Sequence, residues 1–271
     1  MDTSNGDSDP RAQPLYPFFG DFIVDLGIAG KVAVVTGAGG EIGAAICRRL
    51  GHEGAKTVVV DIQIDRARAQ AAELAATGIN ATPIAADVID PAAVDALIAH
   101  TTDLYGRVDI LVNNAGFQRD KRIVNMPVED WDAVVDVVLR GAFLCSKAAL
   151  PRMVENKWGR IVNISSRAHL GNPGQVNYSA AKAGLLGFSR ALAMESGRHG
   201  ITVNSVAPGV VDTAAIRALG HFDKVRENAE RTTPISRLGS VEDVADCVAF
   251  LASERASFIS GEVIHVTGGR Y

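Results

Sequence analysis

Short apolar runs alternate along the chain with longer stretches in which apolar residues recur at helical spacing. The short runs are rich in Val, Ile and Ala and are bounded by Gly, Asp or Asn, which is typical of buried strands. Predicted strands cover residues 31–36, 57–60, 80–86, 108–112, 160–165, 201–206 and 261–266. Predicted helices cover residues 44–53, 65–76, 91–105, 131–154, 177–196 and 241–251.

The alternation of strands and helices predicts an α/β fold, with a doubly wound parallel sheet of the Rossmann type in a single domain. No internal repeat or second domain boundary interrupts the pattern. We assign residues 30–271 to this catalytic domain and residues 1–29 to a partly disordered N-terminal extension. Residues 15–28 are too apolar for a free tail, so we expect them to pack against protein, with a neighbouring subunit as one candidate.

Composition and charge argue against several classes of partner. The chain has 271 residues and a formal net charge of -4, which gives no electrostatic reason to expect nucleic acid or an anionic membrane surface. No apolar run reaches the roughly 18 residues that indicate a membrane span. The chain start lacks the features of a secretory signal, and Cys47, Cys145 and Cys247 are far apart, so we predict a cytoplasmic protein with buried thiols. The dispersed His residues predict no metal site.

A glycine-rich turn follows the first predicted strand and leads into a helix. It reads Gly37-Ala-Gly-Gly-Glu-Ile-Gly43, and such a turn lets backbone amides and the positive end of a helix meet a diphosphate. The next predicted strand ends at Asp61, where an acid suits a free ribose hydroxyl and repels a 2′-phosphate. Asp at the end of a strand is also a common turn residue. The pattern predicts NAD as the cofactor, with NADP less favoured.

Three residues later in the chain carry acid–base chemistry. Tyr178 and Lys182 are four positions apart, so on a helix they share one face. A nearby cation typically lowers the pKa of an acid by about 1 to 3 units, which favours Tyr178 as a general base. Ser165 ends a predicted buried strand, where its hydroxyl is placed to hold a substrate oxygen.

Ser165, Tyr178 and Lys182, together with Thr36, Gly37 and Gly43 of the glycine turn, resemble the signature of the short-chain dehydrogenase/reductase family. The resemblance extends over about residues 31–269. It implies reversible hydride transfer between the cofactor and a secondary alcohol or ketone, with Tyr178 as the base, and a homotetramer that pairs helix faces 136–154 and 178–196. The cofactor contacts it implies are Gly37, Gly39, Gly40, Ile42, Gly43, Asp61, Asp87, Val88, Asn114, Ala115, Gly116, Tyr178, Lys182, Pro208, Gly209, Val211 and Thr213.

The chain departs from the family at two positions. Glu41 stands in place of a glycine of the turn, and we expect its side chain to point outward, away from the pyrophosphate. Val138 stands where the family has an Asn that holds a water of the proton relay. A backbone carbonyl replaces that Asn if the helix is loosened near Gly141.

Other segments are predicted to shape the substrate side. Residues 212–238 lack a long apolar stripe and are interpreted as a mobile lid, in which His221 is exposed rather than catalytic. Arg119, Lys121 and Arg122 form a basic cluster that either meets an anionic substrate or is a solvated face.

Two other functions remain open from the sequence. The Arg119-Asp120 pair after Asn114-Ala-Gly is similar to 3-oxoacyl thioester reductases, but these draw on NADPH, which disagrees with Asp61. We therefore favour oxidation of a small or cyclic alcohol. A dinucleotide-binding regulatory protein with weak or no turnover is the alternative outside the enzymes, and Glu41 and Val138 are its support.

Overall fold

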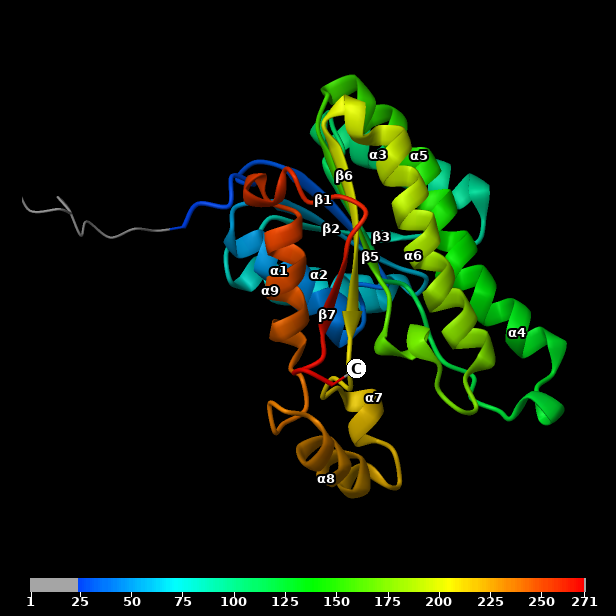
Figure 1. The fold of residues 1–271 in the computed structure, drawn as a ribbon. Coiled ribbons are helices and arrows are strands. Elements are labelled where there is room, and N and C mark those ends of the chain that lie inside the picture. The colour runs from blue at the N-terminus through cyan, green and yellow to red at the C-terminus, as the bar shows by residue number, and fades with distance from the viewer. Residues whose placement is uncertain (1–23, 271) are drawn as a thin grey trace, which may run out of the picture.

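Seven parallel strands form one sheet in the order β3-β2-β1-β4-β5-β6-β7 (Figure 1). The computed structural model describes residues 24–270. The strands are β1 Val32–Thr36, β2 Lys56–Asp61, β3 Ala81–Ala85, β4 Ile110–Asn113, β5 Gly159–Ile164, β6 Ile201–Pro208 and β7 Val263–Val266. The predicted doubly wound α/β fold is confirmed, and each predicted strand is present within two residues of its expected bounds.

Helices cover both faces of this sheet (Figure 1). They are α1 Glu41–His52, α2 Ile64–Ala76, α3 Pro91–Tyr105, α4 Val128–Val135, α5 Gly141–Asn156, α6 Val176–Ser196, α7 Ala214–Arg217, α8 Phe222–Thr232 and α9 Val241–Leu251. α1, α2 and α9 pack on one face, and α3, α5 and α6 pack on the other. Buried strands with a helical layer on each side explain why the strands appear in the sequence as continuous apolar runs.

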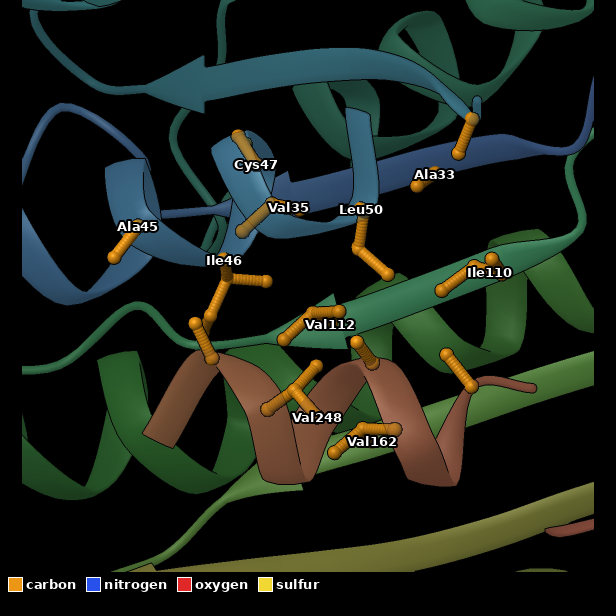
Figure 2. Packing of buried hydrophobic residues seen from close by; sticks show 14 of the residues in the cluster. Ala33, Val35, Ala45, Ile46, Cys47, Leu50, Ile110, Val112, Val162 and Val248 are labelled. Carbon is orange, nitrogen blue, oxygen red and sulfur yellow. The ribbon is translucent and has the colours of Figure 1, made fainter. Parts of the chain in front are cut away.

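The core consists of two layers that share the strands between them. Along β1, Ala33 and Val35 face α1 and α9, whereas Val32 and Val34 face the opposite layer. Figure 2 shows the first layer, in which side chains of α1 and α9 fill the space over β1, β4 and β5. This packing holds the carboxyl ends of β1 and β4 in place, where the winding direction of the sheet reverses.

The predicted helix 131–154 is not one regular α-helix. The chain runs from α4 into a π-helical turn at Asp136–Arg140 and then into α5. In this turn the Gly141 amide donates to the Asp136 carbonyl, five residues earlier, instead of to the carbonyl four residues earlier. The expected loosening of the helix next to Gly141 is therefore confirmed, and Val138 lies within it.

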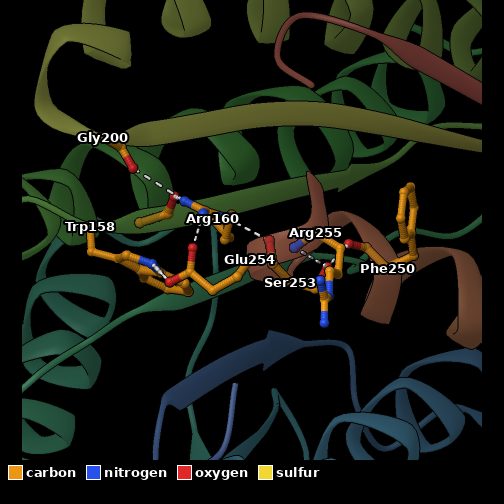
Figure 3. A network of polar contacts seen from close by, with 8 residues as sticks. Trp158, Arg160, Gly200, Phe250, Ser253, Glu254 and Arg255 are labelled. Carbon is orange, nitrogen blue, oxygen red and sulfur yellow. Dashed lines mark hydrogen bonds and ion pairs between the residues drawn. The ribbon is translucent and has the colours of Figure 1, made fainter. Parts of the chain in front are cut away.

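A buried guanidinium joins segments that are far apart in the sequence (Figure 3). Arg160 of β5 is only 2% exposed and donates to the carbonyls of Ser253, Gly159 and Gly200. It also pairs with Glu254 at 3.3 Å, which draws the end of α9 onto the sheet. Burial lowers the pKa of Arg160, and the Glu254 carboxylate acts in the opposite direction.

The start of the described chain packs on this same region. Leu26 and Ile28 are buried in the core of this subunit, and the Leu26 carbonyl accepts a hydrogen bond from the Glu254 amide. The packed body therefore includes residues before position 30, whereas residues 15–23 lie outside the described part of the chain. Within residues 24–270 no helix is long and apolar enough to cross a membrane, and no group of three or more His, Cys, Asp or Glu residues is placed to hold a metal ion.

Candidate active site

A large cleft opens at the carboxyl ends of the strands, with a volume of about 1480 Å³. Typical pockets for one drug-sized ligand measure about 300 to 1,000 Å³, so the cleft has room for a dinucleotide and a small substrate. Every predicted site residue lines it. These are Gly37, Gly39, Gly40, Ile42, Gly43, Asp61, Asp87, Val88, Asn114, Ala115, Gly116, Ser165, Tyr178, Lys182, Pro208, Gly209, Val211 and Thr213.

The glycine turn between β1 and α1 passes close to the neighbouring backbone. Gly37 has a φ of 63°, and a Cβ there would lie 2.9 Å from the Ala115 Cα. At Gly43 a Cβ would lie 2.7 Å from the Ala38 Cα, so neither position accepts a side chain. The Asn114 side chain closes this end of the cleft by donating to the Thr36 and Gly37 carbonyls. The turn thus presents bare backbone at the positive end of α1, a surface suited to a diphosphate.

Asp61 lies at the end of β2 beside this turn. It is 7% exposed, and its two carboxylate oxygens accept hydrogen bonds from the Gly39 and Gln63 amides. Arg66, one turn into α2, donates to the Gly39 carbonyl at 3.0 Å and lines the same part of the cleft. Sequence reasoning missed Arg66, although a basic residue five positions after the strand-end acid was a signal for it.

Tyr178 and Lys182 lie on one face of α6, as predicted, with the Lys182 ammonium 5.4 Å from the centre of the Tyr178 ring. Asn177 holds the start of this helix by donating to the Arg119 and Asp130 carbonyls. Lower down, the Asn163 amide of β5 donates to the Ser189 hydroxyl. These contacts fix α6 against the sheet.

The predicted lowering of the Tyr178 pKa is wrong in direction. Burial raises the pKa of Tyr178, and hydrogen bonds with Gln118 and Ser166 act against that rise. Burial also lowers the pKa of Lys182 to about 7. The Lys182 ammonium donates to the Ile164 carbonyl at 2.5 Å, and its desolvation is the dominant effect on its charge.

The serine that faces Tyr178 is Ser166, one residue after the predicted Ser165. The Ser165 hydroxyl is buried and donates to the Lys182 carbonyl at 2.9 Å, so it is not directed at a substrate. Ser166 forms the hydrogen bond with Tyr178 and caps the short 3-10 turn Arg167–Leu170 by accepting from the Ala168 amide. The exact serine depends on one residue of register at the end of β5, and the strand pattern does not define it.

Val138 of the π-helical turn lies near the ammonium of the pair. It is 2% exposed, and a Cβ placed on Gly116 would lie 3.2 Å from the Val138 Cγ2 and 3.5 Å from the Lys182 Nζ. The side of Lys182 toward α4 and α5 is therefore closed by an apolar side chain. This surrounding contributes to the desolvation that lowers the Lys182 pKa.

Residues 212–238 contain α7 and α8, which lie beyond the carboxyl end of β6 (Figure 1), and several of these residues line the cleft. The apolar side chains of Ile216, Leu219 and Val225 line the cleft, and His221 is exposed, as predicted. The expectation that Glu41 points outward is wrong. Its carboxylate lines the cleft and accepts hydrogen bonds from the Ala214 amide and the Arg217 guanidinium.

Two groups of polar residues near the cleft are each held together by contacts within the group. Arg119 and Lys121 of the basic cluster both bind the Asp130 carboxylate, at 2.9 and 2.8 Å, so these two cations are already engaged within the protein, which favours a solvated face over an anion site. His169 and His265, which the sequence placed 96 residues apart, meet with 2.8 Å between their Nε2 atoms. Burial, followed by the His265 charge, lowers the pKa of His169.

The fold and the cleft define the class of the protein as a nicotinamide-dependent oxidoreductase, and comparisons with known proteins agree. The family model described as enoyl-(acyl carrier protein) reductase matches residues 37–270. The chain belongs to the short-chain dehydrogenase/reductase family.

The matches to individual relatives span nearly the whole length of each relative. The chain is 43% identical to the (2S)-[(R)-hydroxy(phenyl)methyl]succinyl-CoA dehydrogenase subunit BbsD of Thauera aromatica, over 90% of this chain and 98% of that protein. It is 42% identical to the 3-oxoacyl-[acyl-carrier-protein] reductase FabG of Escherichia coli, over 91% and 99%. A crystal structure from Sinorhizobium meliloti assigned to the short-chain alcohol dehydrogenases superimposes with a TM-score of 0.86 at 34% identity, over 90% and 98%.

Proposed function

We propose that the protein is an NAD-dependent dehydrogenase that transfers hydride between a secondary alcohol, or the corresponding ketone, and nicotinamide. The observation that carries this proposal is the meeting of Tyr178, Lys182 and Ser166 with the glycine turn and Asp61 in one cleft. A regulatory protein that only bound a dinucleotide would have no chemical need for a phenol, an ammonium and a hydroxyl at that point.

The residues of the cleft fit the proposed cofactor. The turn at Gly37 and Gly43 leaves space that a Cβ would fill, and the first amides of α1 offer donors to phosphate oxygens. Asp61 would accept hydrogen bonds from the adenosine ribose, and Asn114 to Gly116 would border the other ribose. When bound, NAD would supply a positively charged ring that accepts the hydride at C4.

The protein's own groups then have separate tasks. Ser166 holds the substrate oxygen, and Tyr178 takes the proton from that oxygen as the hydride leaves. Because burial raises the Tyr178 pKa, the phenol rests in its neutral form and must first lose its proton to solvent before it can accept one from the substrate; positive charge nearby favours that loss. Lys182 supplies part of that charge, since a pKa of about 7 leaves it partly protonated at neutral pH.

The preference for NAD depends on the balance between Asp61 and Arg66. Asp61 is buried and held by two amides, so its carboxylate is fixed where a 2′-phosphate would be repelled. Arg66 is a cation within reach of the same region, but it is held by the Gly39 carbonyl. We expect the fixed carboxylate to outweigh the exposed guanidinium because exposed charges are screened by solvent.

A second candidate function is the oxidation or reduction of an acyl thioester at C3. This candidate is favoured by the similarity to a [hydroxy(phenyl)methyl]succinyl-CoA dehydrogenase subunit and to 3-oxoacyl-[acyl-carrier-protein] reductases. Residues 212–238 form the proposed lid over either substrate. We also expect a homotetramer assembled through α5 and α6, which carry the exposed Phe143 and Met194.

The test is a panel of secondary alcohols, ketones and 3-hydroxyacyl or 3-oxoacyl thioesters, each incubated with NAD, NADP or their reduced forms and followed by the absorbance of reduced nicotinamide. Tyr178→Phe should lower turnover by about 100-fold to 10,000-fold while NAD binding, measured by calorimetry, is unchanged. Tyr105→Phe is the matched control, because that phenol binds Thr82 and Asn80 and does not line the cleft. Dinucleotide binding without turnover on any substrate would favour the regulatory protein.

A further inference from the structure

Glu41 connects the glycine turn to the proposed lid. It is the first residue of α1, and its Oε2 accepts a hydrogen bond from the Ala214 amide at 2.5 Å. Its Oε1 accepts from the Arg217 Nη2 at 3.0 Å. The Arg217 Nη1 also pairs with Asp212 at 3.2 Å, so one guanidinium is shared between Glu41 of α1 and a carboxylate of its own segment.

The partners of the Glu41 carboxylate are those that commonly bind phosphate. A backbone amide and a guanidinium both donate to phosphate oxygens, and the guanidinium does so with a geometry that suits two oxygens at once. Glu41 also lies beside the bare backbone of Gly39 and Gly40, where a diphosphate is expected on the proposed function. A carboxylate therefore occupies contacts that a phosphate would also accept.

We propose that Glu41 is a positioning residue that latches residues 212–238 to the glycine turn in the free protein, and that the diphosphate of the cofactor competes with its carboxylate for Arg217 and the Ala214 amide. The proposal rests on the proposed dinucleotide function. It gives Glu41 a role that a glycine at the same position does not have, since glycine has no side chain to reach Ala214.

The charges around the latch limit its strength. The side chains of Glu41 and Arg217 are 43% and 48% exposed, so solvent screens their attraction and the latch is weak enough to open. Removing the carboxylate should free the two donors and remove a negative charge near the diphosphate. Both effects act in the same direction, toward tighter cofactor binding.

The experiment compares the full-length protein with Glu41→Gln, Glu41→Ala and a control, Asp223→Asn. The control removes a carboxylate from another arginine pair of the same segment, Asp223 with Arg226, which has the same 3.0 Å distance but lies within α8. Dissociation constants for NAD are measured by calorimetry. In parallel, trypsin cleavage at Lys224, Arg226 and Arg231 is timed without cofactor.

We expect NAD to bind about threefold to tenfold more tightly to Glu41→Ala, with Glu41→Gln between it and the parent, and residues 212–238 to be cleaved faster in both variants than in Asp223→Asn. Tighter binding separates this role from a merely structural one, because damage to the turn would weaken binding. Arg217→Met should weaken NAD binding and reduce the gain from Glu41→Ala when the two are combined. Unchanged or weaker binding in Glu41→Ala would overturn the competition. Cleavage at the parent's rate would overturn the latch, and a parent that binds neither NAD nor NADP would instead overturn the proposed function.

Discussion

Ser165→Ala and Ser166→Ala should have opposite effects: the Ser166 variant should mainly lose activity, and the Ser165 variant should mainly lose stability. The Ser166 hydroxyl forms a hydrogen bond with Tyr178 and is proposed to hold the substrate oxygen. Loss of one such donor typically lowers kcat by about 100-fold to 1,000-fold, or about 2.7 to 4 kcal/mol. The same hydroxyl caps only a short 3-10 turn, so its removal should cost about 1 kcal/mol of unfolding free energy or less.

Ser165→Ala should show the reverse pattern. Its buried hydroxyl donates to the Lys182 carbonyl within α6, and the loss of one intramolecular hydrogen bond typically costs about 0.5 to 1.5 kcal/mol of stability. Turnover should remain within about threefold of the parent, a change in barrier of about 0.7 kcal/mol.

Both variants are compared by steady-state kinetics on the best substrate of the panel and by urea unfolding followed by circular dichroism. The kinetics are measured well below the unfolding temperature, so that a loss of stability does not lower the active fraction. A Ser165→Ala enzyme that loses 100-fold or more in kcat, beside a Ser166→Ala enzyme within threefold of the parent, would refute the assignment of the substrate oxygen to Ser166.

Three further predictions concern Asp61, Val138 and Lys182. Catalytic efficiency with NAD should exceed that with NADP by at least about tenfold, or about 1.4 kcal/mol. Asp61→Ala should narrow this gap, and the double variant Asp61→Ala with Arg66→Ala should restore part of it. Equal efficiencies with the two cofactors in the parent would contradict the role of Asp61. Val138→Asn should change turnover by less than about threefold, because the helix is already opened in the π-helical turn, and a gain of tenfold or more would show that the relay of the parent is broken. Between pH 7 and 10.5 the unfolded chain keeps a proton on Lys182 that the folded protein has lost, so the free energy of unfolding should rise with pH by up to about 1.4 kcal/mol per pH unit. This rise should be smaller in Lys182→Met. If the urea midpoints of the two proteins changed identically with pH, that result would count against a desolvated Lys182.

The sheet and its helices were predictable because their burial is visible in the residue pattern. A strand such as β2, which is covered on both faces, appears in the sequence as the continuous run Thr57-Val-Val-Val. Glycine is required at positions 37 and 43 because the backbone there passes close to Ala115 and Ala38. Those constraints are local in the sequence or repeat with a fixed period. They place the cleft and the part of its lining that is predicted to contact the cofactor.

The remaining features depend on contacts between distant residues. The partners of Glu41 lie 173 and 176 residues later, so the sequence around Glu41 says nothing about where its side chain points. The sign of the Tyr178 pKa shift depends on how completely the fold removes water, an effect that outweighs the hydrogen bonds with Gln118 and Ser166. The choice between Ser165 and Ser166 depends on one residue of register in a segment without periodic pattern.

The Arg160 network has a consequence for how the chain is made. Its guanidinium is placed in the core by β5, but two of its acceptors, the Ser253 carbonyl and the Glu254 carboxylate, are synthesised more than ninety residues later. Until those residues leave the ribosome, the nascent chain holds a cation that has no complete set of partners in the core. The backbone amide of the same late residue, Glu254, donates a hydrogen bond to the Leu26 carbonyl near the start of the described chain. Closure of the body therefore waits until Ser253 and Glu254 have been made, and a ribosome stalled before Ser253 would display a protease-sensitive chain even though β1 to β6 had been made.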